Sequence, residues 1–529
     1  MLCLGFFWAL AFVDLEELSI LLLAPNEAAQ WGWIAGILSV VLCGMVMVGS
    51  VILVRHRLGR GAAGFGGWIF GAMVWLVLVG VYLAFGRPGF YGERLFVILK
   101  DQADVSSAVK IPDPIQRRSE VYRVLVAHAD RTQAGLRKAL RLRGVPFTSY
   151  YLVNAIEVQG EPLLRFWLLS RPDVDRVLVD TRLRPLPNKP SSADGQGSTL
   201  PQDVGWNLKM IAADRVWNEL GVTGQGILVG QSDTGVQGDH PELAGSYLRR
   251  MPSNDYSWFD PWYGSSTPLD YSEHGTHTLG TVLGRHVGVA PGAGWIACVN
   301  LARNLANPPL YLDCMQFNLA PFPQHGDPLH DGRPEWGAQV LNNSWGCPPI
   351  EGCDPQTLLS AVSALRSAGV FVVVSAGNDG EEGCGTVADP LALYSEVTSV
   401  GAVDRSGVLV PFSSLGPVTA DGSGRIKPDV LAPGQEVLSS VPHNAYATLS
   451  GTSMAGPHVV GVVALMWSAN PRLIGDIART EEILHRTAVR PNGSLPQCGN
   501  PAASGTPNNA GGYGIVNAYE AVREAQKLK

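Results

Sequence analysis

The sequence predicts an α/β fold: a mostly parallel sheet with helices on both faces, preceded by a small α+β domain and an apolar helical region. Three observations support this prediction. Apolar runs alternate with helix-like runs in the second half of the chain, which is typical of a parallel sheet covered on both faces. A segment before them mixes strand and helix patterns, and the beginning of the chain is strongly apolar. We therefore expect a transmembrane helical region at 1–90, an α+β domain at 95–186, a flexible linker at 187–203 and the main α/β domain at 204–529.

Composition agrees with several domains and excludes one class of partner. The chain has 529 residues, more than one ordinary domain contains. It is 46% hydrophobic and 16% charged, and the apolar excess lies near the N-terminus. The net charge of −7 gives no basic surface for nucleic acid, so we expect no nucleic-acid partner.

The N-terminal region is expected to cross a membrane two or three times. Residues 33–54 and 67–85 are each long and apolar enough to span a bilayer. The stretch 1–24 is interrupted by carboxylates, which are costly in a bilayer. Because the loop 55–60 is basic, the positive-inside rule places it in the cytoplasm and everything after the last span outside. A buried helical core in a soluble domain is the alternative.

The segment 95–186 is expected to form a split βαβ sandwich. Its patterns follow a β-α-β-β-α-β-like order. We expect strands at 121–128, 147–158 and 174–179 and helices at 131–143 and 162–169. The following residues 187–203 are rich in Pro, Ser, Gly and Asp, which is typical of a flexible linker.

The main domain is expected to present its site at the carboxyl ends of parallel strands. Asp233 follows one apolar strand, and Asn378 follows another. The apolar runs predict strands at 226–231, 294–300, 340–342, 370–375 and 399–403, and helices at 274–282, 357–367 and 459–467.

Three residues in this domain suit nucleophilic catalysis. Ser453 lies between small residues at the start of the apolar helix, where free backbone N–H groups favour negative charge. A serine needs a base, and a histidine base works best when a carboxylate orients it. His274 and Asp233 supply these groups in the chain order Asp, His, Ser. A helix cap, a core histidine and a turn aspartate are the structural alternatives.

The blocks Asp-Thr-Gly at 233–235, His-Gly-Thr-His at 274–277 and Gly-Thr-Ser-Met-Ala-Gly-Pro-His at 451–458 resemble the signatures of the subtilisin-like serine proteases (subtilases, peptidase S8). The resemblance implies a subtilisin-like fold with Asp233 as orienting carboxylate, His274 as general base and Ser453 as nucleophile. Ser-Ala-Gly-Asn at 375–378 is similar to the oxyanion segment, which implies Asn378 as an oxyanion donor. The substrate-binding residues implied are Ser344, Trp345, Gly346, Ser375, Ala376 and Gly377. The small residues favour a bulky or apolar side chain before the cut.

The resemblance also implies a biological role. The α+β domain is similar in pattern to the propeptides that cover the groove of subtilases, so we expect an autoprocessed zymogen cut in the linker 187–203. The expected protein is a multi-pass, membrane-anchored serine endopeptidase, with polypeptides, its own propeptide-like domain and the lipid membrane as partners. Its chemistry requires no cofactor, and the family's structural calcium has no ligand that the sequence identifies. The alternatives are a transpeptidase or peptide ligase of the same fold, a non-catalytic membrane-bound peptide-binding module and, for 95–186, an ordinary interaction domain.

Cysteines and two loops complete the expectations. Cys347 and Cys353 flank a short loop and form the best disulfide pair, whereas four further cysteines allow three pairings. Reduced cysteines in a cytosolic enzyme are the alternative; Cys3 and Cys43 are expected to be inert thiols. The loop 325–331 contains metal-type ligands but is interrupted by Pro and Gly, which favours a polar loop over a metal site. Five aromatic residues before His274 either line the groove or pack the loop: Tyr256, Trp258, Phe259, Trp262 and Tyr263.

Overall fold

A computed structural model describes residues 93–160, 163–180, 203–302, 305–499 and 505–528, with six isolated positions earlier in the chain. Apart from those six positions, the predicted membrane spans lie outside the described residues. Cys3 and Cys43 also lie outside them, as does the linker except for Asp203. Among the helices that are described, none combines the length and hydropathy needed to cross a bilayer.

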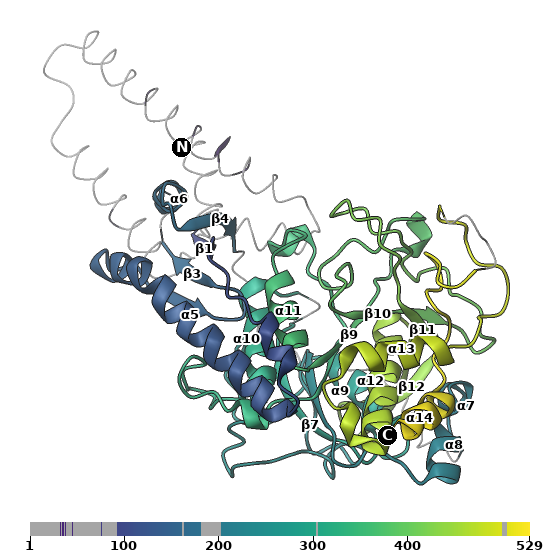
Figure 1. The fold of residues 1–529 in the computed structure, drawn as a ribbon. Helices are drawn as coiled ribbons and strands as arrows, with labels where there is room; N and C mark the ends of the chain where they lie inside the picture. Colours follow the sequence, from purple (N-terminus) through teal and green to yellow (C-terminus); the bar gives the residue numbers. More distant parts are fainter. Residues whose placement is uncertain are drawn as a thin grey trace, which may run out of the picture.

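The N-terminal unit is an antiparallel sheet of order β2-β3-β1-β4 with helices between its strands (Figure 1). One face of β1 packs Leu95 and Val97 against Leu136 and Leu140 of the long helix. The other face contributes to the core shared with the main domain. The elements are β1 (Arg94–Leu99), η1 (Ser106–Lys110), α5 (Pro114–Leu142), β2 (Phe147–Tyr150), β3 (Ala155–Gln159), α6 (Leu164–Leu169) and β4 (Val174–Val179).

Two of the predicted strands in this unit are wrong. Residues 121–128 lie inside α5, because Val121, Leu125 and Ala129 recur every four residues and are buried along one helix face. The Asp113 side chain caps this helix by accepting from Gln116 N. The first strand is instead β1. The single strand predicted at 147–158 is a hairpin, with β2 and β3 joined by a turn.

The main sheet has seven strands in the order β11-β10-β9-β8-β5-β7-β6, and every neighbouring pair is parallel. Each predicted strand of this domain is confirmed, within a few residues at its ends. A separate antiparallel hairpin joins β12 (Val437–Val441) to β13 (Ala445–Leu449). The sheet strands are β5 (Leu228–Asp233), β6 (Trp258–Phe259), β7 (Gly294–Val299), β8 (Val340–Asn343), β9 (Phe371–Ser375), β10 (Thr398–Val403) and β11 (Val430–Pro433).

Helices cover both faces of this sheet, as predicted (Figure 1). Alternate residues of β9 show the two layers, because Val373 shares a core with Val463 of α12, whereas Val372 shares the other core with Leu365 of α11. The longer helices are α9 (His274–Leu283), α10 (Pro308–Leu319), α11 (Leu359–Ser367), α12 (Thr452–Ala469), α13 (Ile477–Thr487) and α14 (Ala518–Lys527). Shorter turns are α7 (Trp206–Met210), α8 (Ala213–Arg215), η2 (Val216–Leu220), η3 (Pro334–Trp336), η4 (Pro349–Glu351), η5 (Gly380–Glu382) and η6 (Pro471–Leu473).

Three disulfides cross-link the main domain. The predicted Cys347–Cys353 pair is confirmed. The other four cysteines adopt one of the three open pairings: Cys298–Cys314 joins β7 to α10, and Cys384–Cys498 closes a loop of 114 residues. No described cysteine is left free.

Candidate active site

Asp233 is the last residue of β5, at the carboxyl edge of the sheet, and its side chain is fully buried. One carboxylate oxygen accepts from Thr234 N at 2.8 Å and lies 2.7 Å from His274 Nδ1. The other accepts from the Thr278 hydroxyl at 3.3 Å. Thr234 N and the Thr278 hydroxyl fix the orientation of the carboxylate. Its oxygen on the side of α9 therefore lies against Nδ1 of His274.

His274 is the first residue of α9, and glycines let this helix approach β5. A Cβ on Gly275 would lie 2.0 Å from the Gly235 carbonyl oxygen, and a Cβ on Gly235 would lie 2.1 Å from the Leu269 carbonyl oxygen. Neither position has room for a side chain. The glycines in the Asp-Thr-Gly and His-Gly-Thr-His blocks thus place the imidazole against Asp233.

The surroundings of His274 favour its charged form. Burial opposes a charge on the ring, but the charge of Asp233 and the hydrogen bond to it outweigh burial and raise the pKa of His274. Asp270 and Glu273 act in the same direction. The side chain remains 26% exposed, so the ring is accessible to solvent. A histidine held in this way can accept a proton and stabilise the resulting charge.

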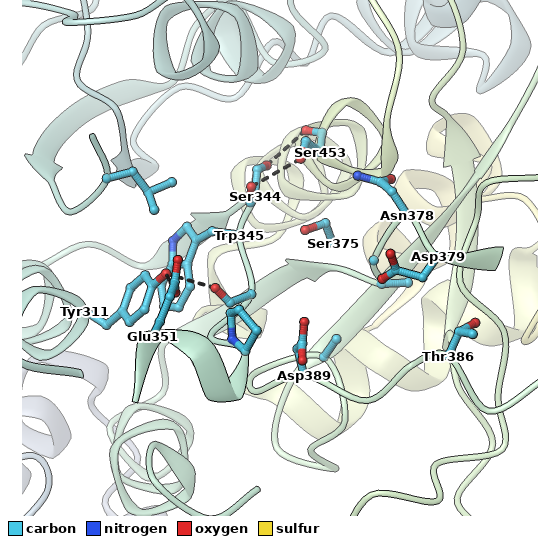
Figure 2. A pocket seen from close by; sticks show the side chains of 16 residues that line it. Tyr311, Ser344, Trp345, Glu351, Ser375, Asn378, Asp379, Thr386, Asp389 and Ser453 are labelled. Atoms are coloured by element: carbon cyan, nitrogen blue, oxygen red, sulfur yellow. Dashed lines mark hydrogen bonds between the residues drawn. The ribbon is translucent and has the colours of Figure 1, made fainter. Parts of the chain in front are cut away.

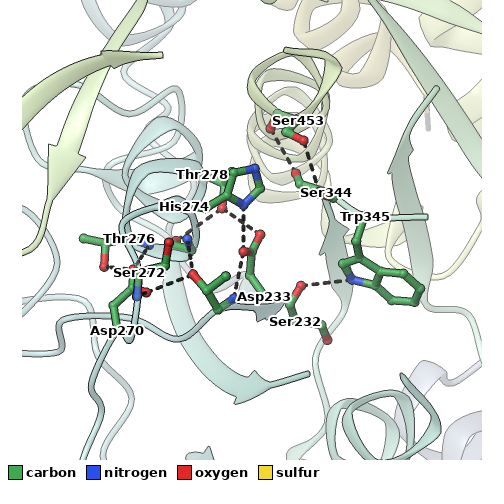
Figure 3. A network of polar contacts seen from close by, with 12 residues as sticks. Ser232, Asp233, Asp270, Ser272, His274, Thr276, Thr278, Ser344, Trp345 and Ser453 are labelled. Atoms are coloured by element: carbon green, nitrogen blue, oxygen red, sulfur yellow. Dashed lines mark hydrogen bonds and ion pairs between the residues drawn. The ribbon is translucent and has the colours of Figure 1, made fainter. Parts of the chain in front are cut away.

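Ser453 is the second residue of α12, where backbone N–H groups have no acceptor within the helix. Its hydroxyl donates to the Ser344 carbonyl oxygen at 3.2 Å, and the Ser344 hydroxyl donates to the Ser453 carbonyl oxygen at 2.9 Å. Figure 3 shows the His274 ring between the Asp233 carboxylate and Ser453. In the described part of the chain, no hydrogen bond joins Ser453 to His274, so the hydroxyl must turn away from Ser344 to reach the ring.

The amide of Asn378 is oriented by α12. Its side-chain oxygen accepts from Thr452 N at 2.9 Å and from the Thr452 hydroxyl at 3.0 Å. Because a backbone N–H can only donate, these contacts assign the oxygen to the Thr452 side and leave the NH₂ group on the side of Ser453 (Figure 2). Asn378 can therefore donate to an oxyanion formed at Ser453.

A cavity of about 230 Å³ extends from Ser453 and Asn378. Tyr311 lies beside it, and Trp345 stacks on this ring at a centroid separation of 4.0 Å. Three carboxylic acids also line the cavity, and the sequence did not single them out: Glu351, Asp379 and Asp389. All six predicted substrate-binding residues border it: Ser344, Trp345, Gly346, Ser375, Ala376 and Gly377.

Asp270 is a second, half-buried carboxylate near the site that sequence reasoning missed. It accepts from the Thr276 hydroxyl at 2.6 Å, Thr276 N at 2.8 Å and the Thr234 hydroxyl at 2.8 Å (Figure 3). Burial raises the pKa of Asp270, and these donors partly oppose that effect. Asp270 thus ties the turn after Asp233 to the first turn of α9. In the sequence, Thr234 and Thr276 of the two blocks were the signal that could have indicated an acceptor such as Asp270.

The aromatic loop before His274 mostly packs on the domain. Trp258 is 1% exposed and donates to the Ser265 carbonyl oxygen. Phe259 stacks on Phe317, and Tyr263 stacks on Tyr271. None of the five predicted aromatic residues borders the cavity beside Ser453.

In the loop 325–331, His330 Nδ1 lies 2.7 Å from an Asp327 carboxylate oxygen. Asp327 N donates to the Asp331 carboxylate at 2.8 Å. Among the residues described, no three His, Cys, Asp or Glu side chains gather as a metal ion requires. We therefore assign no calcium ligand.

Comparisons with known proteins point to one family. A family model described as the subtilase family, Peptidase_S8, matches residues 224–514. Bacillopeptidase F of Bacillus subtilis is 35% identical over 432 residues, which are 77% of this chain and 29% of that relative. M-protease of Shouchella clausii is 32% identical over 57% of this chain and 68% of its own length. Subtilisin Savinase of Lederbergia lenta is 31% identical over 61% of this chain and 100% of its own length.

Proposed function

This chain belongs to the subtilase family and is a serine endopeptidase, and from that premise we propose that Asp233, His274 and Ser453 form its catalytic triad. The observation that supports this most is the buried Asp233 carboxylate 2.7 Å from His274 Nδ1, at the sheet edge where α12 presents Ser453. Family membership leaves the non-catalytic peptide-binding alternative without support.

In the proposed reaction, the Ser453 hydroxyl leaves the Ser344 carbonyl and gives its proton to His274 Nε2. The Ser453 oxygen then bonds to the substrate carbonyl carbon. The oxyanion accepts from the Asn378 NH₂ group and from a backbone N–H at the start of α12. His274 returns the proton to the leaving amine as the C–N bond breaks, and water hydrolyses the acyl-enzyme through the same steps. Asp233 stays ionised and stabilises the imidazolium. No cofactor takes part.

We further propose that the N-terminal unit is a propeptide and that the enzyme is an autoprocessed zymogen. Contacts between the two units support this. Arg118 of α5 is 3% exposed and donates to the Gly337 carbonyl oxygen of the main domain. Tyr151 N donates to the buried Gln316 side chain of α10 at 2.8 Å. A single hydrophobic cluster joins β1 and α5 to α10 and α11. Cleavage in the linker 187–203 would break the covalent connection between the two units.

For location, we propose a multi-pass membrane anchor in residues 1–90, with the lipid bilayer as a partner and the peptidase on the extracytoplasmic side. The apolar stretches and the basic loop 55–60 support the anchor and its orientation. The three disulfides of the main domain support an oxidising compartment.

Expression of full-length Ser453→Ala in its own membrane tests the zymogen proposal. We expect the variant to accumulate as the uncut precursor, whereas Ser450→Ala, an exposed serine outside the cavity, matures like the wild type. Immunoblots and N-terminal sequencing measure both. Maturation of Ser453→Ala with no other protease supplied would contradict autoprocessing. Product masses from a test peptide with an added amine separate hydrolysis from transpeptidation.

A further inference from the structure

The cavity beside Ser453 has walls that suit the stem of a long side chain. Its apolar lining comes from Trp345, Gly346, Pro348, Ala376 and Ala392. In Figure 2, Ser453 and Asn378 are at one end and Asp389 is at the other. A substrate side chain that enters next to Ser453 therefore runs along apolar atoms toward Asp389.

The far end of the cavity is acidic. Asp389 borders the Gly346 wall, since a Cβ placed on Gly346 would lie 3.4 Å from Asp389 Oδ2. Asp379 follows Asn378 directly, and Figure 2 shows its carboxylate on the cavity side. Glu351 is 3% exposed, and one of its oxygens lies 2.6 Å from the Tyr311 hydroxyl. Among the described residues that line the cavity, none is a lysine or an arginine.

Two of these carboxyl groups are affected by a neighbouring carboxylate. Burial, together with the charge of Asp379, raises the pKa of Asp389 to about 6. Burial raises the pKa of Glu351 to about 8; its donors Tyr311 and Ala306 N oppose this, and Asp389 adds to it. Glu351 therefore keeps its proton to a higher pH than Asp389 does. Asp389 is half-buried, and a positive group that enters the cavity would offset the cost of this partial burial.

We propose that this cavity selects substrates with arginine or lysine immediately before the scissile bond, with Asp389 as the main specificity-determining residue. The inference rests on the proposed role of Ser453. The aliphatic stem lies along Trp345 and Ala376, and the cationic group reaches Asp389, with Asp379 adding charge at the rim. An apolar side chain would leave the Asp389 carboxylate half-buried and unpaired. The cavity therefore favours a basic residue in place of the bulky or apolar one expected from the small residues of its wall.

Hydrolysis of peptides that differ only in the residue before the cut tests this proposal with the full-length protein. We expect kcat/KM for arginine and lysine to exceed that for phenylalanine by about tenfold or more, the scale of one charge-assisted hydrogen bond. Asp389→Asn should lower the arginine-to-phenylalanine ratio by about tenfold or more. Glu382→Gln removes a charge from the exposed turn η5 outside the cavity and should leave the ratio unchanged. An unchanged ratio in Asp389→Asn would overturn the assignment.

A second measurement needs no variant and keeps the proposal testable if Asp389→Asn does not fold. Peptidyl chloromethyl ketones ending in arginine or phenylalanine are compared by their rates of inactivation of the wild-type protein. Faster inactivation by the arginine reagent supports the proposal. Faster inactivation by the phenylalanine reagent overturns the specificity but leaves the peptidase in place. Inactivation by neither reagent, with no peptide cleaved, would overturn both this inference and the proposed triad.

Discussion

Replacement of Asn378 by leucine tests the oxyanion site. Leucine has nearly the same size as asparagine but has no N–H to donate. In the structure, Asn378 has two functions that the variant would lose together: its oxygen accepts from Thr452 N and the Thr452 hydroxyl, and its NH₂ group is left on the side of Ser453. The first contributes to stability, and the second contributes only when negative charge develops on the substrate.

The two losses differ in size and in the quantity they change. Loss of one donor from an oxyanion hole typically lowers kcat by about 10²–10³, or about 2.7–4 kcal/mol in the activation free energy, with little change in KM. Thr452 is buried at the start of α12, so the loss leaves its backbone N–H without this acceptor, while its hydroxyl keeps the Gly377 carbonyl oxygen at 3.2 Å. We therefore expect a cost of about 1–3 kcal/mol in unfolding free energy.

Asn378→Asp separates these effects, because aspartate keeps acceptors for Thr452 but replaces the NH₂ group with a charged oxygen. We expect kcat to fall at least as far as in Asn378→Leu while the melting temperature stays closer to that of the wild type. Steady-state kinetics on one peptide and thermal denaturation measure the two quantities. A kcat within about threefold of the wild type in both variants would refute the assignment of Asn378 as an oxyanion donor.

Three further predictions follow from the geometry. Gly275→Ala places a Cβ 2.0 Å from the Gly235 carbonyl oxygen, so the start of α9 must move. We expect kcat/KM to fall by about 10² or more, measured with active-site titration to count the competent enzyme. Normal activity would contradict the close packing of α9 against the turn after Asp233. Because a general base must be neutral, kcat/KM should rise with pH, with a midpoint at a His274 pKa above the usual value of about 6.5. In Asp233→Asn, the residual activity should show this rise at lower pH. A rise at the same pH as in the wild type would refute the pairing. Replacing both Cys384 and Cys498 by serine opens a loop of 114 residues, and urea denaturation should show a loss of up to about 5 kcal/mol; a loss below about 1 kcal/mol would contradict a constraining role.

Sequence alone predicted the main sheet well because its strands are apolar on both sides and are separated by clear helical patterns. The position of Asp233 at a strand end followed from the same pattern. In the N-terminal unit the reasoning failed at Val121, where several neighbouring apolar residues imitated a strand. The correct period appears only over the whole of α5, from its cap at Asp113 onward. Short apolar runs do not distinguish the two structures.

The residues of the site that sequence reasoning missed are those that depend on the folded chain. Asp270 has no pattern of its own, and its role arises from the turn that brings it to Thr234 and Thr276. Glu351 and Asp389 are separated along the chain and meet only because their loops border one cavity. The sequence contains 46 Asp and Glu residues, so nothing in its composition singles out these two.

Labelling with a fluorophosphonate at neutral pH tests the central proposal most directly, since only an activated serine reacts. We expect mass spectrometry of the wild-type protein to find the adduct on Ser453, and His274→Ala to lose it. A folded, mature protein that gains no adduct at Ser453, or an adduct that forms equally well without His274, would contradict the proposed pairing of base and nucleophile.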